Sequence, residues 1–151
     1  MPAFNFKMQN ILNIKEKLEA QQKIEYARAN SALMDEQDKL AQLFIRRKGY
    51  TDQLKEKQTG SLDIKEIHFL KSAIDQVGNM IKDQIRKVDA AQRRLESERV
   101  KLDIAMQERK TYEKLKERAF EKFKADIIYK EGKETDELVA YTYHNNGEEL
   151  D

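Results

Sequence analysis

The sequence lacks cysteine and is poor in helix breakers, with one proline and five glycines in 151 residues. Without cysteine there is no disulfide framework, no thiolate nucleophile and no thiolate metal ligand. The single proline is Pro2, where it suits the entry of a helix. No window approaches the roughly 18 uninterrupted apolar residues of a membrane span, and the N-terminus lacks a signal-peptide layout. We therefore expect a soluble cytoplasmic protein with no membrane insertion.

Charge is abundant but unevenly placed. Charged residues make up 38% of the chain and apolar residues 39%, a balance typical of long amphipathic helices. The net charge is +1, with +7 on residues 1–130 and −6 on residues 131–151. Acidic residues interleave the basic clusters near Arg46, Arg86 and Arg93, which favours a solvated helix face. We expect no nucleic-acid binding.

One unbroken heptad register runs from Ile67 to Phe123. Thirteen of its seventeen positions are apolar, and a sustained 3.5-residue repeat is a coiled-coil signal. A helix of about 60 residues would be roughly 90 Å long, which is too long for the core of a compact domain. Another helix must therefore cover this seam. The seam positions are Ile67, Leu70, Ile74, Val77, Ile81, Gln84, Val88, Ala91, Leu95, Glu98, Leu102, Ala105, Arg109, Tyr112, Lys116, Ala119 and Phe123.

The first helix is predicted over about 4–58, with two heptad frames joined by a four-residue stutter. The early stripe is Phe4, Met8, Ile11, Lys15 and Leu18, and the later one runs from Tyr26 to Leu54. The segment 59–63 reads as a turn, in which Gly60 would end the helix in the left-handed conformation. Asp63 followed by Glu66 has the spacing of a capping box for a second helix over about 64–130.

A short loop between two long amphipathic helices predicts an all-α fold, a long antiparallel two-helix coiled-coil hairpin over residues 1–130. Residues 131–151 would form an acidic tail, partly disordered or in a short helix. Pairing about the turn joins positions whose numbers add to roughly 121. In that register Glu98 falls opposite Lys23, and Phe4 lies near Lys116 or Glu117.

The pairing ends before the second helix does. Beyond about residue 118 the chain still carries an apolar face, which includes Ala119, Phe120, Phe123, Ile127 and Ile128. Either the start of the first helix bends to cover part of this face, or another protein covers it.

The sequence contains no motif typical of a catalytic or metal site. His68 and His144 are the only histidines, and neither has metal-ligand spacing to other ligands. Gly-rich phosphate loops, nucleophile elbows and zinc motifs are also missing. We expect no enzyme activity, no cofactor and no metal.

The chain resembles the flagellar export protein FliJ family over nearly its whole length. The resemblance is carried by FNFKMQNILNIKEKLEAQQKIEYARA near the start, by two long helices with a Gly-containing turn, and by YKEGKETDELVAYTY near the end. It implies a component of the flagellar type III export apparatus, and hence of motility and chemotaxis, associated peripherally with the inner face of the cell membrane at the flagellar base. The implied partners are a hexameric export ATPase, the cytoplasmic part of the export gate, and export chaperones.

The resemblance also implies where partners bind. By analogy with the central stalk of rotary ATPases, the end of the coil that bears the termini would insert into the ATPase ring and promote its assembly. Here that end carries Phe4, Phe120, Phe123 and Ile127. Gate contact would involve residues nearer the turn, where Leu43, Tyr50, Phe69 and Ala73 occupy comparable places. Arg46 and Met80 stand where the family pattern leads us to expect a tyrosine and a histidine.

Two other functions remain open at this point. A chaperone of exported flagellar subunits would bind substrate termini in a groove, and it would co-purify with a cap or junction protein. A self-associating structural coiled coil would sediment as a stable dimer, whereas the stalk is expected to be a monomer in isolation.

Overall fold

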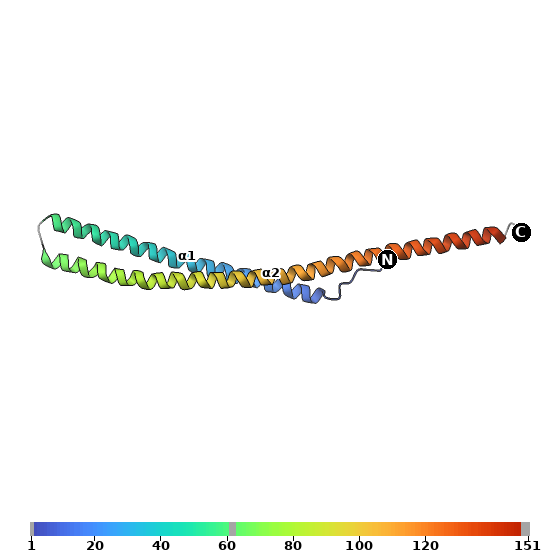
Figure 1. Ribbon diagram of the computed structural model, residues 1–151, viewed down its shortest axis with the longest axis horizontal. Coiled ribbons are helices and arrows are strands. Elements are labelled where there is room, and N and C mark those ends of the chain that lie inside the picture. Colours follow the sequence, from blue (N-terminus) through green and yellow to red (C-terminus); the bar gives the residue numbers. More distant parts are fainter. Residues whose placement is uncertain (1, 61–62, 149–151) are drawn as a thin grey trace. The chain divides into compact units, whose positions relative to one another are not determined.

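The computed structural model describes residues 2–60 and 63–148, and over these residues it consists of two α-helices with no strand. Helix α1 is Gln9–Thr59 and helix α2 is Ile64–Glu148 (Figure 1). The predicted all-α helical hairpin is confirmed. Packing divides the chain into two units, which we call the turn unit (Glu19–Ala105) and the terminal unit (Met1–Leu18 with Met106–Asp151).

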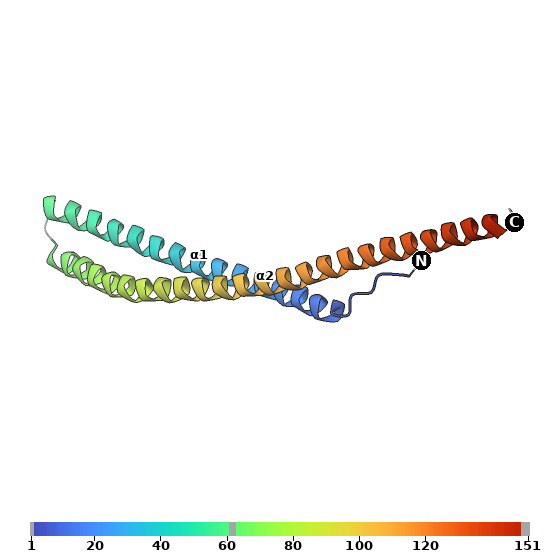
Figure 2. The same cartoon turned by 45° about the vertical axis from the view of Figure 1, so that its right-hand side comes forward.

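In the turn unit, α1 and α2 run antiparallel and side by side in both views (Figures 1 and 2). Every predicted seam position of α2 in this unit, from Ile67 to Ala105, is buried or half-buried. Gln84 contacts Glu36 and Gln22 contacts Glu98, so paired numbers add to 120 in both cases. The predicted register is therefore correct to within a residue. The buried apolar residues here are Ala29, Leu33, Leu70, Val77 and Ile81.

The structure corrects the predicted partner of Glu98. Its carboxylate and main-chain carbonyl accept hydrogen bonds from the Gln22 side chain rather than an ion pair from Lys23. Lys23 instead pairs with Glu19, one turn earlier on the same helix. A neutral amide satisfies the carboxylate without the cost of burying a second charge.

The predicted stutter in α1 is wrong. The seam frame of Tyr26 continues without a break toward the N-terminus through Gln22, Glu19, Lys15 and Leu12, all buried or half-buried. Leu12 is 2% exposed, whereas Ile11 is 38% exposed and Leu18 also faces outward. Three consecutive seam positions are polar (Lys15, Glu19 and Gln22), so a count of apolar residues does not detect this frame.

Side-chain hydrogen bonds define both helix ends at the turn. The Thr59 hydroxyl lies 3.0 Å from the Glu56 carbonyl and 3.3 Å from the Lys55 carbonyl, where it can donate to the last turn of α1. Gly60 does not take the predicted left-handed conformation, since no described glycine has a positive φ. The Asp63 carboxylate accepts a hydrogen bond from the Lys65 amide at 3.0 Å, which makes Asp63 the N-cap of α2. Residues 61 and 62 of the predicted turn lie outside the described residues.

Glu66, the other half of the predicted capping box, forms an ion pair between the two helices. Its carboxylate lies 2.7 Å from the Lys57 ammonium. The hydrogen bond to Glu66 raises the pKa of Lys57. This pair joins the last turn of α1 to the first turn of α2.

In the terminal unit, α1 begins at Gln9 rather than near Phe4, because residues 2–6 are not helical. The Phe6 carbonyl accepts a hydrogen bond from the Gln9 amide at 3.1 Å, and the Phe6 side chain is buried. Helix α2 continues to Glu148, so the segment predicted as a short helix or partly disordered tail extends α2. Side chains 131–144 are all exposed.

Candidate functional site

Three of the four residues predicted at the termini-bearing end form one aromatic cluster. The Phe4 ring centroid lies 5.1 Å from that of Phe120 and 5.4 Å from that of Phe123, at interplanar angles of 65° and 51°. These are favourable tilted and edge-on arrangements, worth about 0.5–1.5 kcal/mol per pair beyond area burial. The fourth residue, Ile127, is half-buried one turn further along α2. The cluster fastens the N-terminal segment to α2.

This cluster corrects the predicted position of Phe4. The pairing register places Phe4 near Lys116 or Glu117, but Phe4 reaches Phe120 and Phe123 instead. The reason is the non-helical backbone of residues 2–6, because extended chain advances about 3.3 Å per residue and a helix only about 1.5 Å. The N-terminal segment runs alongside α2 in both views (Figures 1 and 2). It therefore covers the first part of the apolar face that the sequence leaves open.

Two grooves flank the Phe4 ring within the terminal unit. One has an apolar floor of Phe4, Leu12 and Phe120, and its rim carries Glu16, Lys116 and two further glutamates, Glu113 and Glu117. The other runs between Phe6 and Phe123. Glu113 is paired with Arg109, so the rim offers Glu16 and Glu117 beside Lys116 around an apolar floor.

Interhelical ion pairing holds α1 against α2 below the cluster. The Lys15 ammonium lies 2.9 Å from the Glu108 carboxylate. The hydrogen bond to Glu108 raises the pKa of Lys15. Arg109, also at a seam position, pairs with Glu113 at 2.8 Å. Lys15 therefore pairs across the two helices, whereas Arg109 pairs within α2.

The part of α2 beyond Ile127 presents an apolar face, of which sequence reasoning singled out Ile128 alone. At about 100° per residue, six residues lie on one side of the helix, and all are exposed. The charged residue Glu131 lies between them and Asp136 lies at their edge, while Lys130, Lys133 and Glu137 lie on the other side. The spacing of Ile128, Thr135, Val139 and Thr142 is the signal that could have revealed it. We call this surface the uncovered face; it comprises Ile128, Thr135, Leu138, Val139, Thr142 and Tyr143.

The four residues predicted to face the gate lie in the turn unit in two different settings. Leu43, Tyr50 and Ala73 are half-buried where α1 and α2 pack, whereas Phe69 is 68% exposed. The Arg46 guanidinium lies 5.9 Å from the centre of the Tyr50 ring. Phe69 therefore presents its ring to solvent, whereas the other three lie partly between the helices.

Sequence reasoning missed other exposed apolar residues in the turn unit. Met80 lies on the same side of α2 as Phe69, because residues eleven apart on a helix nearly coincide in angle. Phe44 on α1 is also exposed, beneath the Arg47 guanidinium at 5.2 Å.

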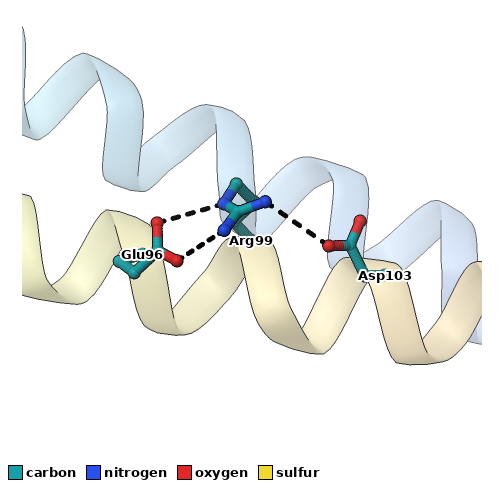
Figure 3. Close-up of polar contacts among 3 residues, drawn as sticks. All are labelled: Glu96, Arg99 and Asp103. Carbon is teal, nitrogen blue, oxygen red and sulfur yellow. Dashed lines mark hydrogen bonds and ion pairs between the residues drawn. The ribbon is translucent and has the colours of Figure 1, made fainter.

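A network of charges on the surface of α2 in the turn unit serves the helix itself. Figure 3 shows Arg99 between Glu96 and Asp103. Its guanidinium donates two hydrogen bonds to Glu96, at 2.6 and 3.0 Å, and lies 3.6 Å from Asp103. The hydrogen bond lowers the pKa of Glu96 and raises that of Arg99. All three side chains are more than half exposed, so the network is solvated and contributes little.

The described residues contain neither a cluster that could bind a metal ion nor a helix that could span a membrane. Residues 2–60 and 63–148 hold no group of three or more acidic or histidine side chains arranged to bind a metal ion. Neither described helix has a stretch apolar and long enough to span a bilayer.

Comparison with known proteins yields one match. The family model described as flagellar FliJ protein matches residues 4–148. No curated protein and no solved structure matches the chain. The matched range contains the aromatic cluster, the uncovered face and the residues around Phe69.

Proposed function

Because the chain belongs to the flagellar FliJ family, whose role lies in flagellar export, we propose that it is a non-enzymatic central stalk of the flagellar type III export apparatus. In this role its terminal unit binds the hexameric export ATPase and promotes assembly of the ring. Residues of the turn unit contact the cytoplasmic part of the export gate. The protein works at the inner face of the cell membrane and also meets export chaperones there.

The uncovered face is the single observation that carries the ATPase assignment. Six neighbouring exposed residues on one side of a helix, with charges on the other side, match the pattern of a helix that lies in an apolar groove of a partner. Contiguous apolar surface of this kind marks interaction sites on other proteins.

The aromatic cluster supports this assignment in a second way. By fastening the N-terminal segment to α2 at Phe120 and Phe123, it stiffens the helix immediately before the uncovered face begins. A stiff base lowers the entropy lost when the helix enters a partner. Phe4, Phe120, Phe123 and Ile127 are therefore proposed as the base of the ATPase-binding surface, and the uncovered face as its contact area.

Gate contact is proposed around Phe69. An exposed aromatic ring is a frequent anchor of an interface, since it buries a large area at low entropic cost. Leu43, Tyr50 and Ala73 lie beneath the surrounding surface and would shape it. Met80, exposed on the same side of α2, is a further proposed contact.

A matched pair of double variants tests the ATPase surface. Ile128→Asp with Val139→Asp places two carboxylates on the uncovered face. Tyr129→Asp with Ala140→Asp places two on the neighbouring, largely charged side at the same spacing. All four residues are exposed, so both variants should keep the fold.

We expect the first variant to lose most of the stimulation of the purified export ATPase and the second to retain it. The readout is ATP hydrolysis as a function of added protein. Equal stimulation by the two variants would refute the uncovered face as the contact area.

A further inference from the structure

The seam positions of α1 and α2 contain an internal sequence repeat, most of which lies in the turn unit. Residues of α1 recur in α2 exactly 62 positions later, so that Gln22, Ala29 and Glu36 correspond to Gln84, Ala91 and Glu98. Of the nine α1 seam positions from 22 to 50, seven carry the same residue as their α2 counterparts. The remaining identical pairs are Leu33 with Leu95, Leu40 with Leu102, Arg47 with Arg109 and Tyr50 with Tyr112.

Two reciprocal contacts show that the repeat is used. The Gln22 amide of α1 donates to the Glu98 carboxylate and to the Glu98 carbonyl at 3.3 Å. The Gln84 amide of α2 donates to the Glu36 carboxylate and to the Glu36 carbonyl at 2.9 Å. Each helix thus supplies one glutamine and one glutamate, and each acts on the other helix in the same way.

The two contacts are related by a local two-fold axis. Gln22 and Glu36 lie seven residues on either side of Ala29, and Gln84 and Glu98 lie seven on either side of Ala91. Ala29 is fully buried and Ala91 half-buried at the midpoint. An antiparallel pair with this symmetry has two helices that are interchangeable at the identical seam positions.

It follows that α2 is complementary to itself. If a second α2 lies antiparallel with Ala91 against Ala91, it presents Glu98 to Gln84, where α1 presents Glu36. It likewise presents Leu102 to Ile81 and Leu95 to Val88, where α1 presents Leu40 and Leu33. The residue types that meet each of these α2 positions are unchanged.

One seam position favours the second α2 over α1. Glu19 of α1 is 5% exposed and, in the observed register, lies beside Leu102. In the self-paired arrangement Ile81 takes that place. The exchange replaces a carboxylate that pairs with Lys23 by an apolar side chain. At two other positions the exchange goes the other way, because Val88 and Ala105 are smaller than Tyr26 and Leu43.

The covalent link between α1 and α2 favours the closed hairpin over the dimer. A short turn keeps α1 at an effective concentration of about millimolar near α2. The closed hairpin therefore dominates in dilute solution, and self-pairing needs a high protein concentration or a weakened α1.

We propose that the segment of α2 from Val77 to Ala105 is a pairing surface for the same segment of a second copy of the chain, in an antiparallel dimer centred on Ala91. This inference is independent of the proposed stalk function. The repeat argues for this occupant, because α2 offers the residue types of α1 at seven of the nine seam positions.

The absence of native cysteine permits a direct test in the full-length chain. Ala91→Cys places a thiol on the proposed two-fold axis, and Ala90→Cys places the same thiol one residue away on the exposed side. In the proposed dimer the two thiols of Ala91→Cys meet. We therefore expect this variant to form a disulfide-linked dimer several-fold faster than Ala90→Cys at high protein concentration. If the hairpin only stays closed, Ala29 shields the first thiol, and Ala90→Cys would crosslink at least as fast; that result overturns the proposal.

A second substitution shifts the equilibrium without altering α2. Ala29→Asp introduces a charge at the fully buried position of α1 and weakens the closed hairpin. Added to each cysteine variant, it should raise the yield of the dimer linked at position 91 several-fold while helix content by circular dichroism is retained. Mere unfolding would instead bring the two crosslinking rates together. That equality, or no gain at position 91, also counts against the proposal.

Discussion

At the scale of single residues, the structure distinguishes side chains that the sequence treats as equivalent. Ile11 and Leu12 are adjacent, aliphatic and similar in size, yet only Leu12 lies in the seam. Its frame is set by Tyr26 and Ala29 further along α1, because a helix transmits its heptad phase along its whole length. The seam positions 15, 19 and 22 are occupied by polar residues, so the heptad frame cannot be recognised there from apolar residues.

Truncation of the two residues should therefore have very different effects. We expect Leu12→Ala to lower the free energy of unfolding by about 2–5 kcal/mol, since it removes a fully buried side chain. Ile11→Ala should cost less than about 1 kcal/mol. Chemical denaturation followed by circular dichroism measures both free energies. A larger effect at Ile11 would mean that Ile11 lies in the seam, as the predicted stutter requires.

Loss of the Phe4 ring should release the N-terminal segment. Phe4→Ala removes both contacts with Phe120 and Phe123, a loss of about 1–3 kcal/mol. We expect trypsin to cleave after Lys7 severalfold faster than in the native chain. Asn5→Ala, at an exposed neighbour, is the control and should cleave at the native rate.

The Lys15–Glu108 pair should give a pH-dependent contribution to stability. The pKa of Lys15 in the folded protein is raised above 10.5 by the Glu108 carboxylate. A raised pKa means that the stabilisation is fully present below the unfolded-state value and is lost as the pH rises through the folded-state value. Lys15→Met should therefore melt below the native chain at neutral pH and match it above the folded-state pKa. Lys17→Met, at an exposed neighbour, serves as the control; a Lys15 difference that persists in strong alkali would contradict the assignment.

At the scale of elements, α2 changes character along its length. Up to Phe123 its seam is covered, first by α1 and then by the N-terminal segment. From residue 131 to residue 144 every side chain is exposed, and the helix depends on its own hydrogen bonds. Isolated helices of this length are marginal in water, so the segment is helical at little net stability.

Hydrogen exchange should report this difference directly. We expect backbone amides of residues 131–148 to exchange orders of magnitude faster than those of residues 77–98, because opening the former exposes no buried apolar surface. Slow exchange of the former in the isolated chain would mean that something covers the segment. Protection that appears only on addition of the export ATPase would support the proposed contact.

At the scale of the whole molecule, the residues that hold the fold together differ from those proposed to bind a partner. The buried seam residues hold α1 to α2, the aromatic cluster fastens the N-terminal segment, and the uncovered face takes part in neither. A surface with no structural task can change without loss of the fold, which suits it to partner recognition.

Two truncated chains separate these tasks. A chain that ends after Lys130 keeps Phe4, Phe120 and Phe123 but loses most of the uncovered face, so it should melt within about 2 °C of the native chain and lose ATPase stimulation. A chain that ends after Lys116 lacks the cluster as well. Full stimulation by the shorter chain would exclude the residues after Lys116 as the ATPase-binding surface. Stimulation by the longer chain alone would assign binding to the cluster.

Much of the fold and part of the candidate site could be predicted because both follow from periodicity. The α2 seam and the pairing of the two helices depend on the 3.5-residue repeat, which the residues display directly. The Gln22–Glu98 contact could not be predicted in the same way. A shift of one residue exchanges Gln22 for Lys23, and only the packed helices distinguish them.

The sequence by itself determined that the chain forms two long antiparallel helices, since the absence of internal proline, the few glycines, the heptad repeat and the single short turn all favour a helical hairpin. Only the tertiary structure decided which apolar residues are left over. Phe120 and Phe123 look unpartnered in a helical register, yet a short non-helical segment reaches them because extended chain covers more distance per residue. The proposed partner surface consequently lies further along α2, at Ile128 and beyond.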